Sequence, residues 1–143
     1  MKRRILALQK CLVRIISGAH RISHADPLFS GLGFLKIDDL FAQAVRVFSY
    51  KMSRNLLPGG ASLHFDKVNH RYNTRGAMTN FSVGSSDGRS IRNIAPVIWN
   101  SLPTELKQSP SIATFKDHSK RGLLAPYAAF ACLVPHCPSC APG

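Results

Sequence analysis

Apolar residues recur at helical spacing near the start of the chain and predict an α-helix over residues 3–17. Intervals of three and four residues place them on one face of that helix. The members of this apolar stripe are Ile5, Leu8, Leu12 and Ile15. Gly18 follows and is typical of a C-terminal helix stop, because glycine adopts the left-handed conformation at little cost.

A second amphipathic pattern predicts a helix over residues 38–56. Asp38 or Asp39 favours the start, since a carboxylate can accept hydrogen bonds from free amides and oppose the helix dipole. Pro58 requires the helix to end before it. The apolar side of this helix comprises Leu40, Phe41, Ala44, Val45, Phe48 and Met52.

Two intervening regions lack such periodicity. Residues 20–27 form a polar turn, and Gly31 and Gly33 break any longer element after it. Residues 58–90 contain five glycines with many Asn and Ser residues. They predict a long loop, with a short strand near residues 81–83.

The C-terminal part predicts two shorter helices. One covers residues 96–102, with Pro96 at the first helical position, where its missing amide hydrogen costs nothing. The other covers residues 110–121, capped by Ser109 or Ser111 and closed by Gly122. Trp99 and Phe115 stand on these helices, and we expect their rings to pack together because neither helix can bury its apolar side alone.

The elements together predict a mainly α protein. We expect a small irregular helical domain or fragment with a long central loop over residues 1–124. Four prolines from Ala125 onward predict a disordered, extended Pro- and Cys-containing tail over residues 125–143.

Charge is the compositional feature that bears on function. Nineteen Lys and Arg residues against seven acidic ones give a net charge of +12 among 143 residues. This excess favours an anionic partner, nucleic acid before membrane; the alternative is that it serves solubility alone. No stretch approaches the roughly eighteen apolar residues of a membrane span, so we expect no membrane partner. The first residues lack a secretory pattern, which favours a nuclear or cytoplasmic protein over a secreted one.

Three sequence blocks carry a family resemblance. The main block is Pro96-Val97-Ile98-Trp99-Asn100-Ser101-Leu102-Pro103, followed by the Phe115-Lys116 helix. The others are Leu8-Gln9-Lys10 with Arg14–His20, and His70-Arg71-Tyr72-Asn73-Thr74-Arg75. In this order they resemble the extreme C-terminal region of reverse transcriptases from non-LTR (LINE-type) retrotransposons, over about residues 5–124.

The resemblance implies a non-catalytic remnant of a retrotransposon reverse transcriptase. The full-length family is an RNA-directed DNA polymerase, but its catalytic acids belong to a palm that precedes the resembling region. The segment itself would help to hold RNA or single-stranded DNA, weakly and without sequence specificity. The alternative is a protein-interaction module whose amphipathic helices dock on a polymerase core or another partner.

Basic and aromatic residues define the expected nucleic-acid contacts. Arg71, Tyr72 and Arg75 combine a ring for base stacking with cations for phosphates. Along the first helix and beyond it, cations could follow a phosphate backbone. The candidate nucleic-acid-binding residues are Arg3, Lys10, Arg14, Arg21, Arg71, Tyr72, Arg75, Arg89 and Arg92. A solvated basic face and a loop anchored by its tyrosine are the structural alternatives.

Catalytic and metal sites are not expected. The Asp38-Asp39 pair stands in a helix-start pattern without the partner carboxylates that two-metal chemistry needs. We therefore expect no enzyme activity. In the tail, one cluster has zinc-like residue types: Cys132, His136, Cys137 and Cys140. Because His136 and Cys137 are adjacent, joint tetrahedral ligation is awkward; we expect free thiols and no cofactor, with zinc as the alternative.

Overall fold

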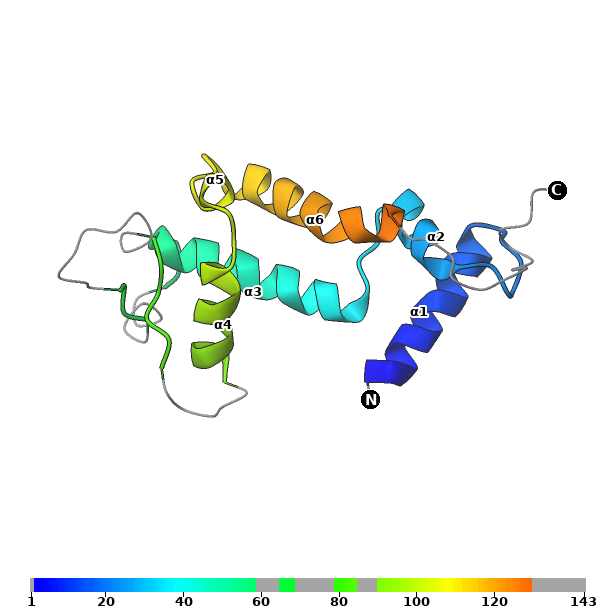
Figure 1. Cartoon of the computed structure of the whole chain (residues 1–143), viewed down its shortest axis with the longest axis horizontal. Helices are drawn as coiled ribbons and strands as arrows, with labels where there is room; N and C mark the ends of the chain where they lie inside the picture. Colours follow the sequence, from blue (N-terminus) through cyan, green and yellow to red (C-terminus); the bar gives the residue numbers. More distant parts are fainter. Residues whose placement is uncertain (1, 59–64, 69–78, 85–89, 130–143) are drawn as a thin grey trace. The chain divides into compact units, whose positions relative to one another are not determined.

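A computed structural model describes residues 2–58, 65–68, 79–84 and 90–129 of the chain. The protein is mainly helical in these ranges, which confirms the predicted fold class. The chain divides into two compact units, one formed by Met1–Leu40 with Lys120–Gly143 and the other by Phe41–Ser119. Figure 1 labels the helices, of which α3 (Ile37–Ser53) and α6 (Ile112–Ala128) contribute to both units.

The first unit begins with α1 (Lys2–Ile16), and this helix confirms the predicted element. Gly18 ends it as expected, with φ +61°. The Ala19 amide donates to the Arg14 carbonyl at 2.9 Å, and the Gly18 amide donates to Ile15 at 3.2 Å. These bonds satisfy carbonyls that the end of a helix leaves without amide partners.

The next helix, α2 (Ala25–Leu32), contradicts the turn and the break that the sequence predicted. Pro27 is tolerated because it lies in the first turn, where its missing amide hydrogen is not needed. Gly33 ends the helix with φ +65°. Phe29 is almost fully buried with Val13, Ala25 and Tyr127, so tertiary packing stabilises a helix that local glycines disfavour.

The start of α3 also differs from the prediction. The helix begins at Ile37, so Asp38 and Asp39 lie in its first turn and neither is the N-cap. The Ile37 amide donates instead to Gln9 Oε1 at 3.0 Å. Both aspartates still oppose the helix dipole from this position. The end of α3 agrees with the prediction that the helix stops before Pro58. The helix finishes at Ser53, and Asn55 after it adopts φ +54°.

The second unit is built around Trp99 and Phe115. Their ring centroids lie 6.2 Å apart, and at most 1% of either side chain is exposed, which confirms their predicted packing. Tyr50 stacks on Phe115 at 4.5 Å. The remaining buried members of this core are Met52, Phe81 and Leu102. Phe41, which the sequence placed on the apolar face of its helix, is 48% exposed.

Helix α4 (Ile91–Asn100) starts five residues earlier than predicted. Ser90 caps it by accepting a hydrogen bond from the Arg92 amide at 3.4 Å. Pro96 therefore lies inside the helix and is buried with Ala95 and Trp99. A four-residue helix, α5 (Thr104–Lys107), follows Pro103.

Helix α6 begins as expected but extends beyond its predicted end. Ser111 caps it by accepting from the Thr114 amide at 3.1 Å. The helix continues through Gly122 and Pro126 to Ala128, so residues 125–128 are helical and not extended. Tyr127 packs edge-to-face against Phe29 with a centroid separation of 6.2 Å, which stabilises this last turn.

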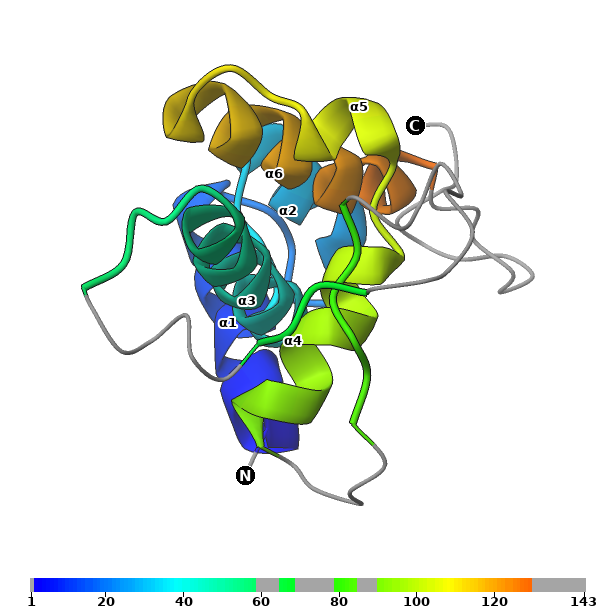
Figure 2. The same ribbon diagram turned by 90° about the vertical axis from the view of Figure 1, so that its left-hand side faces the viewer.

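The described parts of the central loop form an isolated antiparallel bridge between Lys67 and Phe81. The Val68 amide donates to Asn80 at 3.1 Å, and the Ser82 amide donates to Asp66 at 2.7 Å. Figure 2 shows segments 65–68 and 79–84 beside α4. The predicted short strand at residues 81–83 is thus reduced to a single bridge residue.

Candidate functional site

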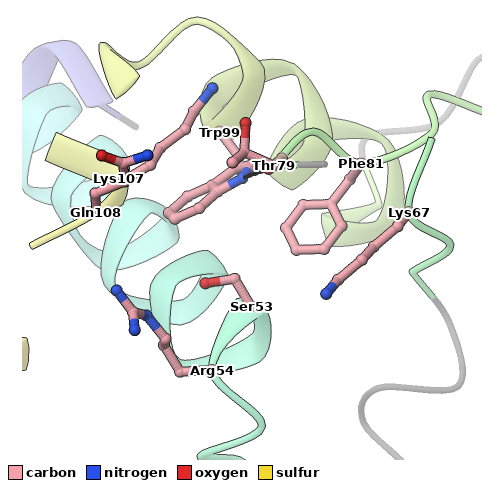
Figure 3. A pocket seen from close by; sticks show the side chains of 8 residues that line it. All are labelled: Ser53, Arg54, Lys67, Thr79, Phe81, Trp99, Lys107 and Gln108. Carbon is pink, nitrogen blue, oxygen red and sulfur yellow. Dashed lines mark hydrogen bonds between the residues drawn. The ribbon is translucent and has the colours of Figure 1, made fainter. Parts of the chain in front are cut away.

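A cavity of about 250 Å³ opens in the second unit between α3, α4, α5 and the Lys67–Phe81 bridge. Its lining residues are Ser53, Arg54, Lys67, Thr79, Phe81, Trp99, Lys107 and Gln108. Figure 3 shows Arg54 and Lys67 flanking this cavity, with Trp99 on one of its walls. The three cationic residues come from positions far apart in the sequence, so the fold alone brings them to one place.

Hydrogen bonds from α4 hold the loop segment against the cavity. The Asn100 side chain makes two hydrogen bonds with the backbone of Phe81. The Phe81 amide donates to Asn100 Oδ1 at 3.0 Å, and Asn100 Nδ2 donates to the Phe81 carbonyl at 2.9 Å. Trp99 Nε1 donates to the Thr79 carbonyl at 2.7 Å. The Trp99 and Phe81 side chains are almost fully buried and form part of the cavity wall.

Lys107 is the cation held most firmly at the site. It is only 7% exposed, and its Nζ donates to Asn80 Oδ1 at 2.9 Å and to the Asn100 carbonyl at 3.3 Å. Burial lowers the pKa of the Lys107 ammonium below its ordinary value, because desolvation penalises the charged form. An ammonium has three donors, so an anion could accept the remaining one.

Arg54 is fixed at one point and keeps further donors. Its Nη2 donates to the Ser109 carbonyl at 3.1 Å, and its guanidinium lies 5.5 Å from the centre of the Tyr50 ring. Tyr50 itself donates to the same carbonyl at 2.8 Å. A guanidinium offers five N–H donors in a planar fork that suits phosphate or carboxylate oxygens.

The electrostatic character of the cavity follows from its lining. Arg54, Lys67 and Lys107 contribute cations, whereas no acidic residue appears among the described residues that line it. Ser53, Thr79 and Gln108 add polar groups. Cations and polar groups of these kinds bind phosphate oxygens by charge-assisted hydrogen bonds.

None of the predicted contact residues on helices is among the residues that line this cavity. In the first unit, Arg3 and Arg21 are exposed and Lys10 is half-buried. Arg14 is engaged in the fold, because its Nε donates to the Ser23 carbonyl at 2.8 Å. Arg92 is exposed on α4 in the second unit.

Several predicted residues lie outside the described ranges. These include the loop candidates Arg71, Tyr72, Arg75 and Arg89. They also include the alternative zinc ligands Cys132, His136, Cys137 and Cys140. Within the described ranges, no three His, Cys, Asp or Glu residues come close enough to hold a metal ion.

The Asp38-Asp39 pair has ordinary partners. Asp38 pairs with Lys2 at 3.1 Å, with both side chains largely exposed. Asp39 accepts a hydrogen bond from the Tyr127 hydroxyl. Neither partner is a further carboxylate of the kind that two-metal chemistry requires.

No signal in the sequence identified Arg54, Lys67 or Lys107 as site residues. Each stands among unremarkable neighbours, and no local motif joins the three. The one sequence feature near the site was the position of Lys107, five residues after the Asn100-Ser101-Leu102 stretch of the block that carries the family resemblance. Nothing in that spacing indicates that Asn100 would bind both the loop and the lysine.

Comparisons of the chain with protein-family models, with curated proteins and with solved structures gave no match. Across the ranges that the structure describes, no helix combines the length and the apolar character needed to cross a membrane.

Proposed function

We propose that this protein binds nucleic acid, RNA or single-stranded DNA, through phosphate groups and without sequence specificity. The observation that carries the proposal is the cavity lined by Arg54, Lys67 and Lys107, with no acidic residue among the described residues that line it. The net charge of +12 also supports the proposal, because it attracts a polyanion over distances longer than a hydrogen bond.

The site favours phosphate over a base. Stacking needs an accessible ring face, but Trp99 is 1% exposed and Phe81 is 3% exposed. The cations supply donors only, so they suit phosphate oxygens, which are acceptors and carry no sequence information. Base stacking by Tyr72 remains a separate prediction, since that residue lies outside the described ranges.

We further infer a retrotransposon origin, as a non-catalytic remnant of a LINE-type reverse transcriptase. The support is the resemblance of residues 96–103 and of the Phe115-Lys116 helix to the C-terminal region of that family. Trp99 and Phe115 from these two blocks pack in one core, which is a structural reason for the two blocks to occur together in the sequence. In this proposal the segment contributes contacts to nucleic acid and no catalytic group.

The alternative function, a protein-interaction module, has one observation in its favour. The apolar stripe of α1, which the helical spacing of its residues predicted, is exposed in the structure. Such a face is unusual on a helix that serves charge contacts alone.

The proposed binding is tested by fluorescence anisotropy of labelled 12-nucleotide single-stranded RNAs over a series of KCl concentrations. The logarithm of the association constant should fall linearly with the logarithm of salt concentration, at about 0.7 units per phosphate contact. Oligo(U) and mixed-sequence RNA should bind with similar affinity. Failure to bind at low salt, or binding without salt dependence, would remove nucleic-acid binding and leave the interaction module.

A further inference from the structure

Helix α1 exposes a continuous apolar stripe. Exposed fractions run from 38% for Ile5 to 71% for Leu8. The full stripe consists of Ile5, Leu8, Leu12, Ile15 and Ile16. The residue of α1 that is buried is Val13, which lies outside this stripe and packs with Phe29 of α2. Helix α1 therefore buries one side within the first unit and leaves its most apolar side exposed.

Helix geometry places the five side chains on one narrow surface. At roughly 100° per residue they fall within an arc of about 100°, and from Ile5 to Ile16 they extend over about 16 Å. Their spacing of three, four and seven residues is that of the contact face between two packed helices. The surface is long enough to pair with about three turns of another helix.

An apolar groove continues this surface. A cavity of about 190 Å³ in the first unit is lined by Gln9, Leu12, Val13, Phe29, Phe34, Leu35 and Leu40. Leu12 belongs to both the stripe and the groove, so the two form one surface. Phe34 and Leu40 are also substantially exposed at its edge. A recess of this size can receive a large apolar side chain from a partner.

The charge of the first unit indicates which kind of partner its apolar surface can bind. The first unit contains nine Lys and Arg residues and three aspartates, a net charge of +6. Helix α1 itself has five cations and no acid. By helix geometry, Arg4 borders one edge of the stripe and Lys2 borders the other.

The three aspartates of the unit are already engaged. Asp26 pairs with Lys36 at 2.8 Å, Asp38 pairs with Lys2, and Asp39 accepts from Tyr127. A second copy of this chain would therefore bring like charge against like charge, which disfavours self-association. An acidic partner would find cations at the border of an apolar surface.

We propose that the stripe and groove of the first unit bind an acidic amphipathic helix of another protein. Its apolar residues would pack along Leu8, Leu12 and Ile15, and one large side chain would enter the groove. Its carboxylates would lie towards Arg4 at the border of the stripe. This is the helix-in-groove mode of recognition, in which anchors recur every three or four residues. The recess favours a partner side chain over the flat surface of a lipid bilayer.

The probe for this proposal is a labelled synthetic 18-residue peptide with leucines at helical spacing and flanking glutamates. Fluorescence anisotropy with the full chain should give saturable binding. Leu8→Gln and Leu12→Gln should each weaken it about tenfold or more, because a leucine that becomes buried is replaced by a polar group. Both residues are exposed, and glutamine is a good helix former, so the variants should keep the fold.

Two controls separate this surface from others. Val97→Gln replaces an equally exposed apolar residue on α4 of the other unit and should leave the affinity unchanged. Lys67→Met removes a cation of the proposed nucleic-acid cavity and should also leave the peptide affinity unchanged. Weaker peptide binding by this variant would show that the acidic peptide binds at that cavity. A peptide with lysines in place of the glutamates should bind at least tenfold more weakly.

Several outcomes would overturn the proposal. They are no saturable binding, equal binding by the Leu8→Gln/Leu12→Gln protein, or equal binding of the lysine-flanked peptide. Binding to phosphatidylcholine–phosphatidylserine vesicles that Leu12→Gln abolishes, without peptide binding, would assign the surface to lipid. A concentration-dependent dimer that Leu12→Gln dissociates, seen by sedimentation, would assign it to a second copy.

Discussion

The hydroxyl of Tyr127, near the end of α6, donates a hydrogen bond to the carboxylate of Asp39 in the first turn of α3, 88 residues away in sequence. Tyr127 Oη also accepts from the Lys36 amide at 3.2 Å. The ammonium of Lys36 lies 4.3 Å from the centre of the same ring and pairs with Asp26. One tyrosine thus connects the start of α3 to the end of α6 within the first unit.

Removal of the Tyr127 hydroxyl should destabilise the protein. We expect Tyr127→Phe to lower the free energy of unfolding by about 1.5–3 kcal/mol, because the bond has a charged acceptor. Asp38→Asn is the matched control, since it breaks only an exposed ion pair and should cost less than about 1 kcal/mol. Urea unfolding followed by circular dichroism measures both. Equal effects of the two substitutions would contradict the assigned role of Tyr127.

The same tyrosine predicts a loss of stability at alkaline pH. Burial, followed by the hydrogen bond to Asp39, raises the pKa of Tyr127 above its ordinary value of about 10. A raised pKa favours the protonated form in the folded state, so its contribution is fully present below pH of about 10 and declines above it. Between pH 9 and 11, unfolding free energy should therefore fall more steeply in the wild type than in Tyr127→Phe. Parallel curves would refute this linkage.

The ring core of the second unit should be sensitive to truncation. Phe115→Ala should cost about 3–5 kcal/mol, because it leaves a cavity beside Trp99 and Tyr50. Phe34→Ala, at a side chain that is 46% exposed, should cost much less. Trp99 is the single tryptophan, so its emission reports directly on this core. A wild-type emission maximum typical of solvent-exposed tryptophan would contradict the packing.

The binding of RNA should depend on the protonation of Lys107. Because burial lowers its pKa, Lys107 loses its proton at a lower pH than an unperturbed lysine does. As pH rises towards the ordinary lysine range, affinity for RNA should fall earlier in the wild type than in Lys107→Arg, whose guanidinium stays charged. Anisotropy titrations at constant ionic strength provide the comparison. Identical pH profiles would mean that Lys107 does not contact the ligand.

Local sequence signals predicted the elements that local interactions control. The periodicity of residues 3–17 and the following Gly18 identified α1, and Pro58 bounded α3 correctly. Ser111 was among the two caps considered for α6 and is the one used. In each case the deciding interaction joins residues only a few positions apart.

The errors at α2 and at the end of α6 have a common physical cause. Helix α2 forms despite Gly31 and Pro27, and α6 passes Gly122 and Pro126, because Phe29 and Tyr127 pack against each other from opposite ends of the chain. Asp39 has a distant partner that no helix-cap pattern could reveal. Tertiary contacts of this kind override local propensity, and a single sequence does not display them.

The candidate site could not be predicted for the same reason. Its cations are 13 and 40 residues apart, from Arg54 to Lys67 and from Lys67 to Lys107. The two hydrogen bonds between Asn100 and Phe81 and the bond from Lys107 to Asn80 hold the loop and Lys107 at the cavity, whereas Arg54 donates to the Ser109 carbonyl. The net charge of +12 needs no knowledge of the fold, and the anionic partner that it favours stays a prediction.

The central claim is that the cavity at Arg54, Lys67 and Lys107 contacts a phosphate of the bound strand. Its most direct test is the salt dependence of single-stranded RNA binding by Lys67→Met and by Lys116→Met, which remove equal charge from exposed positions inside and outside the cavity. Lys67→Met should weaken binding about tenfold and reduce the salt slope by about 0.7, as expected for one lost contact to a single strand. Lys116→Met should change both only slightly; equal effects of the two variants would show that net charge alone, and not this cavity, binds the RNA.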